Sequence, residues 1–195
     1  MGNRILFDFP DLIETNRLYI RHCKPGDGYK LHKAINSSIK NLSKWMALAQ
    51  KEQTVEEIEE GIRKSYADFI LRKDFRLHIY KKDDGEFAGS TGFHRIDWKT
   101  GSLEIGYWGV SSHSGNGYIT EAVKELTRFA FEHLAVHRVE IRCDELNHAS
   151  RRIPERLGYT LEGTLRRNSL SADGQELRNT CVYSVLADEW KYHHH

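Results

Sequence analysis

The stretch SLEIGYWGVSSHSGNGYITEAV, residues 102–123, places a glycine-rich loop between a strand and a helix. Residues 103–110 are expected to form the strand, and apolar residues recur with a helical period over residues 118–134. Gly115 and Gly117 bracket Asn116 between them. Loops of this kind aim backbone N–H groups and the positive end of a helix at one spot, which suits a phosphate group. A purely structural turn is the alternative, but the strand predicted at residues 137–144 favours a pyrophosphate site.

Two well-known phosphate loops do not match this stretch. The chain contains no GxxxxGK[ST] sequence, which excludes a Walker A loop. A dinucleotide fingerprint requires GxGxxG, but Thr120 stands at the third glycine position and no acidic residue follows at a suitable distance. The loop must therefore be interpreted from its surroundings.

The rest of the chain predicts an α/β (α+β) fold with one mixed, mostly antiparallel central sheet flanked by helices. A strand at residues 14–23 is followed by two helices, the second starting at a capping box formed by Thr54 and Glu57. Three strands separated by turn signals then suit an antiparallel meander. Helix 118–134, strand 137–144 and a short helix at 150–158 follow, and a hairpin turns at Asp173-Gly174. A meander that leads into a strand–helix–strand crossover implies a mixed sheet.

Composition excludes several classes of protein. A chain of 195 residues suits one domain, expected at residues 1–192, while His193–His195 resemble the remnant of a purification tag. The net charge of +1 gives no reason to expect a nucleic-acid or membrane surface. No apolar run approaches the roughly 20 residues of a spanning helix, and no signal peptide opens the chain. Three widely spaced cysteines indicate neither a disulfide framework nor a metal site, so we expect a cytoplasmic protein without a metal.

Residues 102–123 resemble the central motif of the GNAT superfamily of acetyl-CoA-dependent N-acetyltransferases. The narrower resemblance is to the branch of the RimJ and RimL ribosomal-protein N-terminal acetyltransferases, whose features are an E-x-G-Y-W strand, an RGxGY-like loop and EA at the helix start. The stretch ELNHASRRIPERLGY (145–159) matches the pattern N-x-x-S followed by E-x-L-G-[FY]. ETNRLYIR (14–21), GYTLEGTLRR (158–167) and VYSVLADEW (182–190) resemble the opening and closing strands, so the similarity covers nearly the whole chain.

The resemblance implies a GNAT fold, acetyl-CoA as co-substrate and a set of site residues. Glu104 is expected to be the base that takes a proton from the amine, directly or through water, with a solvated strand acid or a structural ion pair as the alternative. Ser150 is expected to protonate the leaving thiolate, although a helix N-cap is the commonest role at such a position. The resemblance also implies that the strand splays away from its neighbour near Val110, at a bulge that Gly109 would ease, so that a backbone N–H near Val110 meets the oxyanion. Asn147 would contact the pantetheine or order its loop.

The pyrophosphate cradle implied by the resemblance consists of six consecutive residues: Gly115, Asn116, Gly117, Tyr118, Ile119 and Thr120. Ser114 stands where the superfamily has Arg or Gln, and Ile119 where it has a small residue. Losing the Arg charge is expected to weaken the hold on pyrophosphate or to shift it to another cation. Pro154 stands where other branches carry a Tyr that acts as the general acid. Inside a helix, a proline would also kink the helix.

The predicted function is acetyl transfer to a primary amine, most naturally the N-terminal α-amine of a ribosomal protein. Small amines such as polyamines, aminoglycosides or amino acids remain alternative acceptors, and a non-catalytic acyl-CoA-binding module is a third alternative. Relatives of the family suggest a homodimer.

Overall fold

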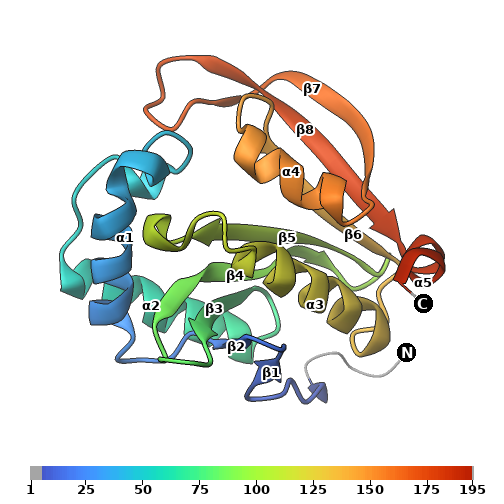
Figure 1. The fold of residues 1–195 in the computed structure, drawn as a ribbon, viewed down its shortest axis with the longest axis horizontal. Coiled ribbons are helices and arrows are strands. Elements are labelled where there is room, and N and C mark those ends of the chain that lie inside the picture. The colour runs from blue at the N-terminus through green and yellow to red at the C-terminus, as the bar shows by residue number, and fades with distance from the viewer. Residues whose placement is uncertain (1–5, 195) are drawn as a thin grey trace.

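Eight strands form one sheet in the order β1-β2-β3-β4-β5-β6-β8-β7 in the computed structural model, which describes residues 6–194 and side chains up to Trp190 (Figure 1). The strands are β1 Ile13–Glu14, β2 Leu18–His22, β3 Phe75–Lys81, β4 Phe87–Asp97, β5 Ser102–Gly109, β6 Arg138–Asp144, β7 Thr160–Leu170 and β8 Leu177–Leu186. The helices are α1 Gly28–Leu42, α2 Val55–Ile70, α3 Tyr118–Glu132, α4 His148–Arg156 and α5 Ala187–His194, with short helical turns η2 Ala47–Ala49 and η3 Ser111–His113.

Strands β5 and β6 are the one parallel pair among the described strands. Helix α3 connects them, and parallel neighbours require a crossover of this kind. All other neighbouring strands run antiparallel. The mixed, mostly antiparallel sheet predicted from the sequence is therefore confirmed, as are the hairpin β7–β8 and the capping box of Thr54 with Glu57.

The two faces of the sheet carry different helices. Helix α3 packs Val123 and Leu126 on the face that includes Leu103 and Ile105 of β5. Helices α1 and α2 form a second core cluster on the other face, where Trp108 of β5 packs against it. In Figure 1, α3 runs along the middle of the sheet while α1 and α2 gather at one side. Because strand side chains alternate, each residue of β5 points either toward α3 or away from it.

The C-terminal end of the chain bears on the predicted tag. Helix α5 ends at His194, and its backbone includes His193. His195 lies outside the described residues. The interpretation of residues 193–195 as a tag remnant therefore stays a prediction.

Candidate active site

Strands β5 and β6 pair over three residues and then separate. The last pair is Glu104 with Glu140. Beyond it, β5 stays paired with β4 as far as Gly109, and β6 stays paired with β8 as far as Asp144. The hydrogen-bond ladder between β5 and β6 is thus interrupted at the carboxyl ends of both strands.

The backbone donors that face this interruption are not the ones the sequence predicted. Val110 donates its N–H to the carbonyl of Ala88 at 2.9 Å, and β5 shows no register shift against β4 between Glu104 and Gly109. The separation of β5 from β6 agrees with the predicted splay, but the bulge and the use of Val110 itself as the donor are wrong. Hydrogen-bonding directions alternate along an antiparallel strand. Because the backbone N–H of Val110 points toward β4, the N–H groups of Tyr107 and Gly109 point the other way, toward the interruption.

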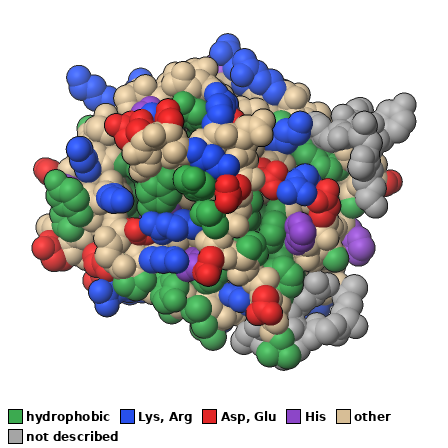
Figure 2. Space-filling view, turned by 60° about the horizontal axis from the view of Figure 1, so that its bottom comes forward, with side chains coloured by type: hydrophobic (Ala, Val, Ile, Leu, Met, Phe, Trp, Pro, Cys, Tyr) green, Lys and Arg blue, Asp and Glu red, His purple; other side chains and the backbone are tan. Residues whose placement is uncertain are grey.

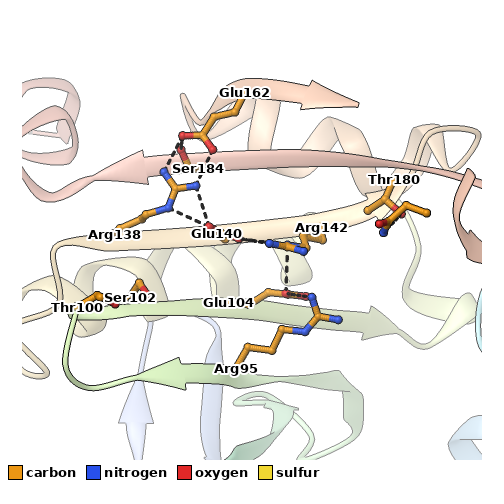
Figure 3. Close-up of polar contacts among 11 residues, drawn as sticks. Arg95, Thr100, Ser102, Glu104, Arg138, Glu140, Arg142, Glu162, Thr180 and Ser184 are labelled. Atoms are coloured by element: carbon orange, nitrogen blue, oxygen red, sulfur yellow. Dashed lines mark hydrogen bonds and ion pairs between the residues drawn. The ribbon is translucent and has the colours of Figure 1, made fainter. Parts of the chain in front are cut away.

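Glu104 lies at the point of separation, on the face of the sheet opposite α3. Its side chain is 17% exposed, and its Oε2 is buried without accepting a hydrogen bond from any described residue. Arg95 Nη1 lies 3.3 Å and Arg142 Nε 3.7 Å from that oxygen (Figure 3). Burial raises the pKa of Glu104, and the two arginines only partly oppose this effect. A buried carboxylate with a raised pKa and an unused lone pair is suited to accept a proton.

A chain of ion pairs fixes Arg142 next to Glu104. Arg142 Nη2 lies 3.0 Å from Glu140 Oε2, and the other oxygen of Glu140 lies 2.8 Å from Arg138 Nη2. Arg138 in turn pairs with Glu162 of β7 at 2.6 Å, as Figure 3 shows. Since each charge has a partner, this series of ion pairs orders side chains across β5, β6 and β7 without leaving a large net charge.

Helix α4 is capped by Asn147 and not by Ser150. The Asn147 Oδ1 accepts a hydrogen bond from the N–H of Ser150 at 3.1 Å, which places Ser150 in the first turn of the helix. The alternative of Ser150 as N-cap is therefore wrong, and its hydroxyl is not needed to begin the helix. Asn147 orders the loop through this cap.

The hydroxyl of Ser150 meets Tyr107, the tyrosine of the E-x-G-Y-W strand. Tyr107 donates its hydroxyl to the backbone carbonyl of Ser150 at 2.9 Å and accepts from Ser150 Oγ at 3.3 Å. Pro154, which lies inside α4, has no N–H with which to bond that carbonyl. Tyr107 supplies the missing donor. Burial raises the pKa of Tyr107, so its hydroxyl stays protonated.

Glu104 and Ser150 approach the interruption from opposite faces. Tyr107 is three residues after Glu104, so alternation places its side chain on the α3 face, where it packs on the main core cluster. Ser150 contacts Tyr107 on that face. A carboxylate thus stands on one side of the separated strands and a hydroxyl on the other, with two backbone N–H groups between them.

The glycine loop follows β5 directly and presents unpaired N–H groups. Gly115 has φ +84° and Gly117 φ +78°, conformations that only glycine adopts without strain. Within the described part of the chain, five N–H groups of the loop and first helical turn donate to no acceptor: those of Gly115, Gly117, Tyr118, Ile119 and Thr120. A concave set of free N–H groups at a helix N-terminus fits a pyrophosphate.

Ile119 does not crowd this loop, although the family has a small residue there. A Cβ at Gly109 would lie 2.9 Å from Ile119 Cγ1, and a Cβ at Gly89 would lie 2.8 Å from Ile119 Cδ1. The isoleucine therefore packs onto two glycines of β4 and β5. The larger side chain is accommodated in the sheet, away from the cradle.

Comparison with known proteins agrees with this geometry. The model of the acetyltransferase (GNAT) domain matches residues 17–160. The chain belongs to the GNAT family of acetyltransferases. YdaF of Bacillus subtilis (strain 168), named a putative ribosomal N-acetyltransferase, is 32% identical over 91% of this GNAT chain and 95% of its own. The ribosomal-protein-serine acetyltransferase of Escherichia coli (strain K12) is 26% identical over 90% of this chain and 93% of its own.

A solved structure extends the comparison to the co-substrate. The microcin C7 self-immunity acetyltransferase MccE, in complex with acetyl-CoA and AMP, superimposes with a TM-score of 0.85 at 25% identity over 91% of this GNAT chain and 97% of its own. The free N–H groups of the glycine loop fit the pyrophosphate of such a co-substrate. Within residues 6–194, no cluster of three or more potential ligands could hold a metal ion, and no helix is long and apolar enough to cross a membrane.

Three residues of this GNAT site were not predicted from the sequence. Tyr107 is part of the quoted motif without a role of its own, and Arg95 and Arg142 stand among ordinary alternating polar residues. Pro154 was the available signal for Tyr107, because a proline inside a helix leaves the carbonyl one turn earlier without its N–H donor. No local pattern distinguishes the two arginines from solvated strand residues.

Proposed function

We propose that the protein transfers the acetyl group of acetyl-CoA to the N-terminal α-amine of a protein, of the ribosomal type, in the cytoplasm. The observation that carries the proposal is the separation of β5 from β6, which places Glu104 and Ser150 on opposite sides of one interruption. When bound, acetyl-CoA supplies the thioester carbonyl that the amine attacks. An α-amine has a pKa of about 7.7–8.0, so a single carboxylate is a sufficient base at neutral pH.

The residues divide the chemistry between them. Glu104 accepts the proton that the amine nitrogen loses as it forms the new N–C bond. The N–H groups of Tyr107 and Gly109 donate to the oxygen on which negative charge develops. As the C–S bond breaks, Ser150 donates its hydroxyl proton to the departing sulfur, and solvent restores that proton. Tyr107 holds Ser150 in place for this step.

The arginines beside Glu104 favour a protein N-terminus over a polycationic acceptor. Arg95 and Arg142 both lie within 4 Å of the proposed base, and the Arg95 side chain is 67% exposed. An acceptor with several ammonium groups would bring several positive charges to these guanidinium groups, and like charges repel. An α-amine followed by a neutral or acidic peptide carries at most one positive charge and meets less repulsion. The names of YdaF and of the Escherichia coli relative support the same acceptor class.

An acceptor screen tests the proposal. Purified protein is incubated with acetyl-CoA and one amine at a time, and released thiol is measured. The acceptors are N-terminal peptides of ribosomal proteins, spermidine, an aminoglycoside and free amino acids. We expect release with peptides whose α-amine is free and none with the same peptides after N-terminal blocking. Faster release with spermidine or the aminoglycoside than with any peptide would overturn the assignment of the acceptor.

The same screen addresses the third alternative, a module that binds acyl-CoA without catalysis. Binding of acetyl-CoA by calorimetry with no thiol release for any amine would favour that module. The Oε2 of Glu104 argues against it, because this oxygen is buried beside Arg95 and Arg142 but accepts no hydrogen bond, and such burial costs stability that binding of acyl-CoA alone does not require.

A further inference from the structure

The turn between β1 and β2 is hydrogen-bonded to the first turn of α3. Thr15 donates its hydroxyl to Glu121 Oε1 at 2.6 Å, and the backbone N–H of Arg17 donates to the same oxygen at 3.0 Å. Arg17 Nε donates to Glu121 Oε2 at 2.6 Å. Both oxygens of one carboxylate in the first turn of α3 are thus held by residues about a hundred positions earlier in the chain.

Arg17 also contacts the glycine loop itself. Its Nη1 donates to the carbonyl of Asn116 at 3.0 Å, and its guanidinium lies 4.8 Å from the centre of the Tyr118 ring. A Cβ at Gly117 would lie 3.6 Å from Arg17 Nη2. The guanidinium therefore stands at the edge of the loop and touches three consecutive residues of it, while its side chain stays 49% exposed.

The contact with Asn116 orients one of the free N–H groups. The chain contains no cis peptide bond among the described residues, and in a trans peptide the C=O and the next N–H point in opposite directions. Since the carbonyl of Asn116 points at Arg17, the N–H of Gly117 points away from it, into the cradle. Without Arg17, this peptide unit would rotate more easily, because Gly117 on its C-terminal side restricts it little.

The charge of Arg17 is also in the right place. Glu121 in the first turn of α3 would repel an anion at the helix N-terminus. Burial would raise the pKa of Glu121, but the bonds from Thr15 and Arg17 outweigh it and lower that pKa, so the carboxylate is ionised. The guanidinium neutralises it. Ser114, at the position where the family carries a cation, cannot contribute a charge.

We propose that Arg17 is a positioning residue for the coenzyme A pyrophosphate: it fixes the 116–117 peptide and neutralises Glu121, the acidic residue in the first turn of α3. This inference rests on the proposed function only in requiring that the glycine loop binds coenzyme A. It assigns the control of this helix N-terminus to a residue of the N-terminal turn, far in sequence from the loop.

Calorimetric binding of three ligands tests this role without turnover. The ligands are coenzyme A, dephospho-coenzyme A, which keeps the pyrophosphate but lacks the 3′-phosphate, and pantetheine, which lacks both. We expect Arg17→Gln to weaken coenzyme A and dephospho-coenzyme A by about ten- to a hundredfold each, and to leave pantetheine unchanged. Arg17→Lys, which keeps the charge but not the planar fork, should fall between the parent and Arg17→Gln. Arg63→Gln, which removes another exposed arginine paired with a glutamate, is the matched control and should change none of the three.

Each other outcome has a defined meaning. Equal weakening of all three ligands would show a general loss of structure, and weakening of coenzyme A alone would assign Arg17 to the 3′-phosphate; either result overturns the inference. Unchanged binding in Arg17→Gln overturns it as well. If the parent protein bound none of the three ligands, the proposed function would fail first. Should Arg17→Gln not fold, Arg17→Lys carries the comparison, with thermal unfolding as the check of integrity.

Discussion

The hydroxyl of Tyr107 bonds the backbone carbonyl of Ser150, one turn before the proline that cannot bond it. The bond of 2.9 Å ties strand β5 to the first turn of α4, and the same hydroxyl lies 3.3 Å from Ser150 Oγ. The strand that carries the proposed base thus also positions the proposed acid. A substitution at Tyr107 should therefore affect the chemical step through Ser150.

We expect Tyr107→Phe to lower kcat about tenfold and to leave the KM for acetyl-CoA nearly unchanged. The loss of a buried hydrogen bond should also cost about 1–2 kcal/mol of stability, because the Ser150 carbonyl is left without a donor. Ser150→Ala should lower kcat more, and without the roughly 1 kcal/mol loss expected of a helix cap, because Asn147 caps α4. Steady-state kinetics and urea unfolding check both variants. If Tyr107→Phe slowed an enzyme that already carries Ser150→Ala by a further tenfold, Tyr107 would not act through Ser150.

Glu104→Gln should lower turnover most in the pH range above the raised pKa of Glu104 and below the pKa of the acceptor amine. The pKa of Glu104 is raised by burial, so the parent gains the ionised base only as pH rises through that elevated value. Near pH 6 the acceptor amine is mostly protonated, and loss of the base should cost about a hundredfold or more in kcat/KM. Above the pKa of the amine the loss should shrink. A pH profile of kcat/KM makes the measurement, with Glu162→Gln as the control, since Glu162 belongs to the same ion-pair chain but lies on β7.

Glu104→Gln should lower activity without lowering the stability of the fold at neutral pH. A carboxyl whose folded pKa is raised prefers to be protonated in the folded state, so it contributes stability at acidic pH and loses it as pH rises through the folded pKa. We expect Glu104→Gln to be at least as stable as the parent at pH 7. Urea unfolding at pH 7 measures this, and a clear loss of stability would show that the pairs with Arg95 and Arg142 dominate over burial.

Sequence alone located the loop and the strand–helix–strand unit, because both are encoded in neighbouring residues. Glycine spacing, the periodicity of residues 118–134 and the Glu104 strand are local patterns. The errors lie where the outcome depends on contacts between distant segments. The oxyanion donor is predicted near Val110, but the N–H of Val110 itself donates to Ala88 of another strand. A helix N-cap is the alternative role of Ser150, but Asn147 caps the helix, and only backbone geometry distinguishes two such good capping residues.

The effects of the two departures from the family motif, at Ser114 and Ile119, also depend on contacts between distant segments. Ile119 stands where the family has a small residue, and two glycines on β4 and β5 make room for it. Loss of the cation at position 114 is predicted to weaken the hold on pyrophosphate or to shift it to another cation, and Arg17, which neutralises Glu121, is that candidate. Arg17 and Glu121 are 104 residues apart in the chain, so no local pattern could have paired them.

Gly109→Ala should destabilise the protein by about 1–3 kcal/mol through overpacking against Ile119. Ile119→Ala in the same chain should relieve much of that cost, because the clashing atom belongs to a side chain. Gly89→Ala is the contrasting variant: its Cβ would lie 2.4 Å from the backbone oxygen of Trp108, which Ile119→Ala does not remove. Urea unfolding of the parent, the three single variants and the two double variants measures the two double-mutant cycles. Equal rescue of both glycine substitutions would contradict this assignment of the contacts.

Among the carboxylates next to helix α1, Asp27 should account for most of the stability that is lost at acidic pH. Burial would raise the pKa of Asp27, but bonds from Arg21 at 2.7 and 2.8 Å and from the N–H of Lys24 at 2.9 Å outweigh it and hold that pKa well below its usual range. Its contribution is therefore present above the unfolded value of about 3.9 and is lost as pH falls below it. Asp27→Asn should cost about 3 kcal/mol at pH 7, because it leaves a half-buried guanidinium unpaired. The deficit should narrow between pH 5 and pH 3 in urea unfolding, whereas Asp83→Asn, 70% exposed, should show neither effect.

Arg95→Gln should relax the discrimination between acceptors. Arg95 is exposed and lies 3.3 Å from Glu104, so it repels a cationic acceptor without being needed to hold the sheet. We expect the ratio of kcat/KM for spermidine to kcat/KM for an N-terminal peptide to rise about three- to tenfold, since one unit charge at a partly exposed site contributes roughly 1 kcal/mol. The effect should shrink at high salt, because exposed charges are screened. A ratio that does not change with either the substitution or the salt concentration would mean that the arginines do not select the acceptor, and that Arg95 serves only to lower the pKa of Glu104.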